Sequence, residues 1–227
     1  MIMSDHIVKA YDTDLEAMVN TIVEMGGLAE TQVAGALVAL TQRDLAAAGR
    51  VIATDPRLDA LEETVDQMAV RLFALRQPVA IDLRLIAMSL KISNDLERIG
   101  DYAVNVAKRS RRLAKEPNLP AIKSLGRLGQ LCQDMLTDVI DAYIQRDAKK
   151  AMTVWHRDTE VDEFYDSIFR EVLTYVLEDP RTTSASIDLL FIAKHLERIG
   201  DHATNIAERL HYVIHGDRIN RLRSETT

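Results

Sequence analysis

One short segment occurs twice in the chain, nearly unchanged. LERIGDYAVNVAK begins at Leu96, and LERIGDHATNIAE begins 100 residues later at Leu196. Upstream, TQRDLAAAGRVIATDPRLD aligns with IQRDAKKAMTVWHRDTEVD at an offset of 103, so that Asp59 lies opposite Asp162. The offset changes because the turns before the two motifs, RQPVAIDLR and EDPRTTSASIDL, differ in length. An internal duplication therefore predicts a fold of two similar halves.

Each half has the pattern of long helices. Only 5 prolines and 9 glycines interrupt stretches rich in Ala, Leu, Glu and Arg, and apolar residues recur every three or four positions, as in Ile92, Leu96, Ile99 and Ala103. No alternating strand pattern is present. Breaks are expected near residues 42–44, 77–78, 116–120, 145–147 and 178–184.

These breaks predict an all-α fold of two homologous antiparallel three-helix bundles, six long helices in all. The first bundle is expected to span residues 1–116 and the second residues 117–216, with PNLP at the joint. Residues 217–227 are expected to form a C-terminal tail.

Charge and composition limit the classes of function. The net charge is −7 and the pI is about 5.4, which argues against a nucleic-acid surface. The one basic run, KRSRR at 108–112, is interpreted as cations at a helix C-terminus, and no basic pocket for free phosphate is evident. With a single Cys132, no leader and no apolar segment of about 20 residues, a cytoplasmic protein is expected.

The repeated motif places oxygen-bearing side chains on one helix face. At about 100° per residue, Glu97, Asp101 and Asn105 lie away from the apolar stripe, and the second copy repeats this pattern. The preceding helix of each half adds further acids at helical spacing, and such neighbouring carboxylates repel each other. These acids are Asp55, Asp59, Glu62, Glu63 and Asp66 in the first half, and Asp158, Asp162 and Asp166 in the second.

If the two helices lie antiparallel, their acidic faces meet along an outer groove. A cation would relieve the repulsion, and oxygen ligands leave iron, manganese, magnesium, calcium and zinc open. The candidate metal ligands are Glu97, Asp101, Asn105, Asp59, Glu63, Asp66, Glu197, Asp201, Asn205, Asp162 and Asp166. The alternative is a solvated face with scattered ion pairs, since Arg98 can reach Asp101 and Lys194 can reach Glu197.

Gly100 and Gly200 lie inside the repeated helices, where glycine costs about 1 kcal/mol relative to alanine. Close approach of a neighbouring helix explains both glycines, and a hinge is the alternative. His202 lies partly off the acidic stripe and stands opposite Tyr102 in the other copy, which makes it a lesser candidate ligand. The chain lacks the common nucleotide-binding, zinc-protease and nucleophile-elbow motifs, so no enzyme activity is predicted.

The paired LERIGD turns, RQPVAIDLRLI, MGGLAETQV at 25–33 and HIVKAYDTDLE at 6–16 resemble the PhoU family. The likeness covers essentially the whole chain. It implies two three-helix bundles and a negative regulator of the phosphate starvation response and of phosphate uptake. The implied partners are the ATPase subunit of a phosphate ABC transporter and a membrane sensor histidine kinase, which would recruit the protein to the inner face of the membrane.

Several members of that family are dimeric, so a homodimer is also implied. Some members carry iron or zinc clusters on Glu/Asp-x-x-x-Asp motifs, which correspond here to Glu97 with Asp101 and Glu197 with Asp201. The remaining alternative is a carboxylate-bridged di-metal enzyme or a metal-storage bundle, which requires inward-facing ligands and an enclosed cavity.

Overall fold

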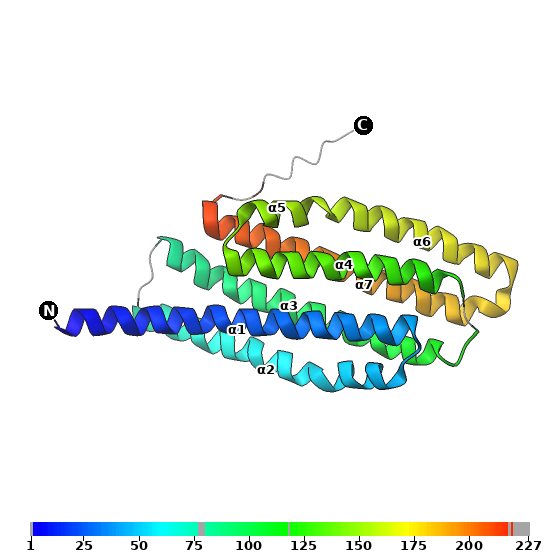
Figure 1. Cartoon of the computed structure of the whole chain (residues 1–227), viewed down its shortest axis with the longest axis horizontal. Coiled ribbons are helices and arrows are strands. Elements are labelled where there is room, and N and C mark those ends of the chain that lie inside the picture. The colour runs from blue at the N-terminus through cyan, green and yellow to red at the C-terminus, as the bar shows by residue number, and fades with distance from the viewer. Residues whose placement is uncertain (1, 77–79, 118, 218, 220–227) are drawn as a thin grey trace.

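The computed structural model describes residues 2–76, 80–117, 119–217 and 219, and these are helical with short connections. The elements are α1 (Ile2–Thr41), α2 (Leu45–Arg76), α3 (Ala80–Leu113), α4 (Ala121–Gln145), α5 (Ala148–His156), α6 (Asp158–Glu178), the 3₁₀ helix η1 (Pro180–Thr182) and α7 (Thr183–His215). The seven described α-helices form six rods, because α5 and α6 follow each other in one rod. The rods run back and forth along the long axis (Figure 1). The prediction of an all-α fold with six long helices is confirmed.

The helix boundaries follow the expected breaks. Asp44 and Asp147, which match in the two copies, begin α2 and α5 by the same device. Oδ1 of Asp44 accepts hydrogen bonds from the backbone N–H groups of Ala46 and Ala47 at 2.8 and 3.0 Å. Oδ1 of Asp147 accepts hydrogen bonds from the backbone N–H groups of Lys149 and Lys150, in the first turn of α5, at 2.8 and 3.1 Å. Both carboxylates satisfy donors that a helix N-terminus leaves free. The expected break at 77–78 lies outside the described residues.

Helices α1 to α3 form one bundle and α4 to α7 the other, side by side (Figure 1). The halves join where α1 packs on α4 and α3 packs on α7, whereas α2 packs only on α1 and α3 among the described elements. The buried apolar side chains of both halves form one continuous core cluster, from Met18 on α1 to Leu210 on α7. The division into residues 1–116, 117–216 and 217–227 stays a prediction. None of the described helices has an apolar stretch sufficient to cross a membrane.

Helices α3 and α7 run antiparallel at the centre of the molecule. Near one end of the pair, Arg112 of α3 forms an ion pair with Asp188 of α7. Near the other end, Nε of Arg84 donates to the carbonyl oxygen of Val213 at 3.4 Å. The two copies of the LERIGD motif therefore lie beside each other midway along the contact.

The contact between α3 and α7 is approximately repeated about a local twofold axis. Asp95 pairs with His202, and the ring centroids of Tyr102 and His195 lie 5.7 Å apart. His195 occupies in the second copy the place of Asp95, and Tyr102 occupies in the first copy the place of His202. The same pair of positions thus makes a polar contact on one side of the axis and an aromatic contact on the other.

The outer rod of each half departs from a regular continuous helix at nearly matching positions of the two copies. Helix α2 contains Pro56, which removes one backbone donor from the helix. In the second half the rod is interrupted at Arg157, so that Asp158 becomes the first residue of α6. The sequence predicted one continuous helix here, and that prediction missed the interruption. Asp158 is well placed beside the helix N-terminus, where a negative charge is favourable.

Gly100 and Gly200 are sites of close helix packing, as expected. A Cβ atom at Gly100 would lie 2.4 Å from Cδ2 of Leu58 on α2 and 2.7 Å from Oε1 of Gln32 on α1. A Cβ atom at Gly200 would lie 3.1 Å from Cγ1 of Val161 on α6. In the first half the glycine therefore lets α3 approach both of its neighbours, and in the second half the packing is looser.

A candidate metal centre in each half

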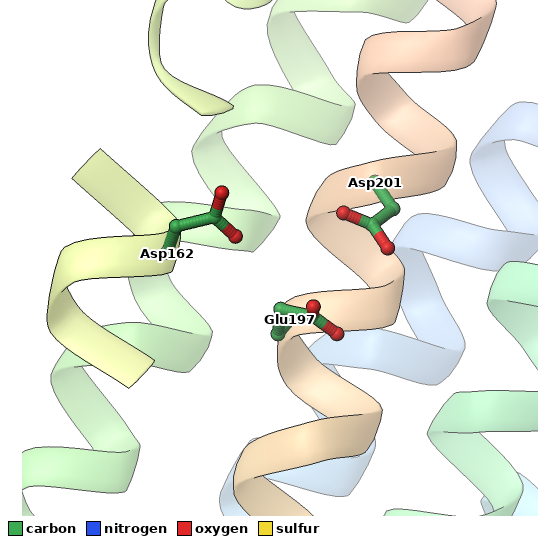
Figure 2. A group of neighbouring side chains, drawn as sticks. All are labelled: Asp162, Glu197 and Asp201. Carbon is green, nitrogen blue, oxygen red and sulfur yellow. The ribbon is translucent and has the colours of Figure 1, made fainter. Parts of the chain in front are cut away.

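Three carboxylates converge in the second half of the molecule. Glu197 and Asp201 lie one turn apart on α7, and Asp162 extends toward them from α6 (Figure 2). One oxygen from each of the three residues lies within 4.8 Å of the others. These residues line a surface pocket of about 400 Å³, together with Asp158 and Asn205. The groove expected between the acidic faces of the two helices is thus a feature of this half.

The three carboxylates of the second-half site differ in their exposure to solvent. Glu197 is 8% exposed, Asp201 is half-buried and Asp162 is exposed. Burial, together with the charges of Glu197 and Asp158, raises the pKa of Asp201 to about 6. Oxygen Oε2 of Glu197 is buried and accepts no hydrogen bond within the described part of the chain. The negative charge at the inner end of the pocket is therefore incompletely compensated.

Basic side chains partly compensate the same carboxylates. Nζ of Lys194 donates to Oε1 of Glu197 at 2.5 Å, and Nη1 of Arg198 donates to Asp201 at 3.1 Å. Nε of Arg198 also lies 3.8 Å from Oε2 of Glu197, too far for a hydrogen bond. The ion pair predicted between Lys194 and Glu197 is confirmed, but it satisfies only one oxygen of that carboxylate.

The first half carries a related but less convergent site. Burial, together with the charge of Asp101, raises the pKa of Glu97 to about 7. Burial also raises the pKa of Asp55, and the charges of Asp59 and Asp101 add to this shift. Oε2 of Glu97 is buried without a hydrogen bond, and its nearest cationic atom is Nε of Arg98 at 3.4 Å. The predicted pair of Arg98 with Asp101 is present at 3.2 Å.

The two sites differ in how closely their ligands gather. Among the described residues, the group of Asp162, Glu197 and Asp201 is the one in which three potential ligand atoms come this close. In the first half Glu62 instead accepts a hydrogen bond from Asn94 at 3.1 Å, and Glu63 accepts one from Gln67 at 3.2 Å. The first site would need movement of its side chains to surround an ion.

The remaining candidate ligands lie at different distances from these sites. Asn205 lines the second pocket, and Asn105, its counterpart on α3, is half-buried. Glu63, Asp66 and Asp166 are exposed and do not line the pocket or join the convergent group.

Asp55 and Asp158 belong to the sites, although sequence reasoning named them only as part of the acidic stripe. Asp158 lines the second pocket, and the charges of Asp59 and Asp101 act on Asp55 in the first half. The signal for both was present in the alignment of the halves, where the two residues match at the offset of 103.

His202 also lines the second pocket, but its imidazole is already engaged. Its Nδ1 atom lies 2.9 Å from Oδ1 of Asp95 on α3, and its ring centroid lies 5.7 Å from that of Tyr102. His202 is absent from the group whose ligand atoms converge. Its position links the second site to the contact between the halves.

Comparisons with known proteins agree on one family. The sequence model of the PhoU domain matches the chain twice, at residues 22–110 and 125–210. A Caulobacter vibrioides protein named as a homolog of the phosphate-specific transport system accessory protein PhoU is 48% identical, over 97% of this chain and 96% of its own length. The Serratia marcescens protein of that name is 35% identical over 97% of this chain and 90% of its own.

Two solved structures share the fold. The crystal structure of PhoU from Pseudomonas aeruginosa has a TM-score of 0.89 and 39% identity, and the alignment covers 91% of this chain and 100% of that one. The crystal structure of the phosphate transport system regulatory protein PhoU from Streptococcus pneumoniae has a TM-score of 0.85 and 28% identity, covering 92% and 99%.

Proposed function

The chain belongs to the PhoU family, and from that membership we propose that it is a regulatory accessory protein of phosphate transport and not an enzyme. The observation that carries this proposal is the match of both repeats, together with relatives of that name aligned over nearly the whole chain. A match of this extent supports a shared role better than a match to one motif does, because the helices on both sides of each site are included.

In its finer form, the proposal makes the protein a negative regulator of the phosphate starvation response and of phosphate uptake. It would act as an adaptor between the ATPase subunit of a phosphate ABC transporter and a membrane sensor histidine kinase. Its place would be the cytoplasm, at the inner face of the membrane when it is bound to these partners, and it would form a homodimer.

Exposed apolar side chains on the outer rods support a role in protein binding. Val70 on α2 and Leu173 on α6 occupy matching positions in the two halves and are 68% and 42% exposed. Their exposed neighbours on the same rods are Phe73, Phe169 and Leu177. Surfaces of this kind on a folded protein commonly contact partners.

We further propose that metal ions bind the two acidic sites, with iron, zinc, manganese and magnesium as candidates. The residues fit such ions, because carboxylate and amide oxygens suit hard and borderline cations. Buried oxygens of Glu97 and Glu197 that accept no hydrogen bond support the same reading. A bound ion would join α6 to α7 and α2 to α3, and would thereby set the rigidity of each half.

The alternative of a carboxylate-bridged enzyme or a metal store has less support. Such sites are built from inward-facing ligands in a bundle core. Here Asp162 is exposed and the second pocket opens at the surface between α6 and α7. An open surface site of this kind suits a regulatory metal ion better than a reaction that requires an enclosed cavity.

Deletion of the gene, with a phosphate-responsive reporter assayed in rich phosphate, tests the regulatory role. We expect loss of repression and its recovery on expression of the intact chain. Repression that is unchanged in the deletion strain would contradict the proposal. A complementing variant with Val70→Asp and Leu173→Asp tests docking: it should fail to restore repression, whereas Glu63→Gln, on the exposed face of α2, should restore it.

A further inference from the structure

A basic cluster lies where the last turns of α3 meet the first turns of α7. Two guanidinium groups of α3 converge on one carboxylate of α7. Nη1 of Arg109 donates to Oδ1 of Asp188 at 2.7 Å, and Nε of Arg112 donates to Oδ2 at 3.0 Å. Nη2 of Arg112 donates to Oδ1 as well. The carboxylate thus holds the two guanidinium groups side by side.

These side chains line a surface pocket of about 460 Å³. Its charged and hydroxyl groups come from Arg109, Arg112, Lys115, Glu116, Ser184 and Asp188. Three cations against two carboxylates leave a local positive charge in a chain whose net charge is −7. The side chain of Arg112 is 61% exposed, and exposed Lys115 forms no ion pair with any described residue. Donors of both residues are therefore free to bind a ligand.

The second copy does not repeat this basic cluster. At the matching end of the twofold-related contact, Arg209 is the counterpart of Arg109 and pairs with Asp95. The counterparts of Arg112 and Lys115 are Tyr212 and His215. Arg109 and Arg209 are therefore common to both copies, whereas Arg112 and Lys115 have no Arg or Lys counterpart in the second copy.

We propose that this pocket binds a small oxyanion and that its ligand is orthophosphate. Guanidinium groups present paired N–H donors that match a tetrahedral oxyanion, and the lysine adds a point charge. The pocket follows from the geometry, whereas the identity of the anion rests on the proposed role in phosphate transport. Such a pocket was not predictable from the sequence, because Arg112 and Asp188 lie 76 residues apart and meet only through the antiparallel contact.

The two carboxylates would select among oxyanions. Orthophosphate retains at least one proton near neutral pH and can donate a hydrogen bond, whereas sulfate has no proton to donate. An ionised carboxylate accepts about four hydrogen bonds, and Asp188 uses three of these sites for the arginines. A free acceptor on Asp188, with Glu116 in the lining of the same pocket, favours a protonated oxyanion and disfavours a fully ionised one.

Isothermal titration of the purified full chain with orthophosphate, at constant ionic strength and in the presence of a chelator, tests the proposal. The chelator removes any ion through which the acidic sites could capture phosphate. We expect saturable binding that weakens about tenfold in Arg112→Gln and also in Lys115→Gln, the loss typical of one charge-assisted hydrogen bond. Arg111→Gln is the matched control, because Arg111 is exposed in the same helical turn but does not line the pocket.

Absence of saturable binding would overturn the proposal, and so would equal affinity in all three variants. Parallel titrations with sulfate and O-phosphoserine separate the sources of the anion: weaker binding of both supports free orthophosphate, and tighter binding of phosphoserine assigns the pocket to a phosphorylated group instead. These measurements are independent of the reporter assay. If the chain does not bind orthophosphate but the reporter shows repression, only the proposal of an anion pocket is wrong. If it binds orthophosphate but the reporter shows no repression, only the proposed regulatory role is wrong.

Discussion

Nδ1 of His202 on α7 lies 2.9 Å from Oδ1 of Asp95 on α3, in the middle of the contact between the two halves. Asp95 is 2% exposed, and it also forms an ion pair with Arg209. One buried carboxylate therefore holds two side chains of the other half. It is the buried polar centre of an interface that has further polar contacts near both ends, from Arg112 to Asp188 and from Arg84 to the carbonyl oxygen of Val213.

Replacement of that carboxylate should weaken the whole fold. Asp95→Ala leaves Arg209, which is 24% exposed, without its partner, and we expect a loss of about 3 kcal/mol in the free energy of unfolding. Urea denaturation followed by circular dichroism measures the change. The exposed Asp66→Ala should shift stability by no more than about 0.5 kcal/mol. Similar stability of the two variants would mean that the pair contributes little.

The two central glycines should respond differently to alanine. Gly100→Ala places a methyl group 2.4 Å from Leu58, which is 1% exposed and has little room to move. We expect a loss of about 1–2 kcal/mol even after the gain in helix propensity. Gly200→Ala should be nearly neutral, since its nearest contact would be 3.1 Å.

Gly49→Ala is the matched control for these glycines, because it lies exposed within α2 and a Cβ atom there would meet nothing within 4 Å. It should raise stability by about 0.5–1 kcal/mol. Denaturation midpoints of the three variants give the order directly. An order in which Gly100→Ala is the most stable would show that close packing does not explain the glycine.

Metal binding should be stronger in the second half than in the first. Glu197→Gln with Asp201→Asn removes two of three converging carboxylates, and we expect it to abolish the tighter fraction of bound iron or zinc. Glu97→Gln with Asp101→Asn should remove only the weaker fraction. Elemental analysis after dialysis against graded metal concentrations measures both, and circular dichroism verifies the fold.

Glu63→Gln with Asp166→Asn is the control for metal content, since both side chains are exposed outside the convergent group. Metal content that is equal in all three double variants would identify the carboxylates as a solvated face.

The contribution of Glu97 and Asp201 to the stability of the metal-free protein should fall as pH rises between about 4.5 and 7. Burial holds the pKa of Glu97 at about 7 and that of Asp201 at about 6, both above their ordinary values. At these two carboxyl groups the folded state therefore binds more protons than the unfolded chain in this window, and their deprotonation favours unfolding. After screening is allowed for, we expect about 1–2 kcal/mol in total.

Urea midpoints at pH 5, 6 and 7.5 in chelator measure this contribution as the difference in stability between the unmodified chain and Glu97→Gln with Asp201→Asn. The comparison is needed because burial lowers the pKa values of His195 and His202, which makes stability rise with pH in both proteins. A difference between the two proteins that does not change with pH would contradict the raised pKa values of the carboxyl groups. Added metal should oppose the trend, because ions bind the ionised carboxylates and affinity increases as protons leave.

Helix positions were predictable because the sequence carries local signals for them. Asp44 and Asp147 have the chemistry of helix caps, and Pro180 and Gly216 occur just beyond helix ends. The interruption at Arg157 had no such signal, since WHRDT contains neither glycine nor proline. A continuous pattern of helix-forming residues there favoured a single rod.

The sites were predictable only in part, because spacing along one helix does not determine its rotation relative to the next. Glu197 and Asp201 were identified from the repeat itself, and Asp162 from the same stripe on the outer rod. Glu63 and Asp66 fit that stripe equally well by spacing, but the packing of α2 on α3 leaves both exposed. Selection among the acids of α2 needed the tertiary contact.

The local twofold axis between α3 and α7 has an evolutionary consequence. An isologous contact between two identical subunits forces every residue to serve both sides of the axis at once. Tethering the two copies in one polypeptide lifts that constraint, so that a histidine and a tyrosine have come to occupy equivalent positions 202 and 102. Assembly of this contact no longer depends on protein concentration, and each half is free to specialise without its twin.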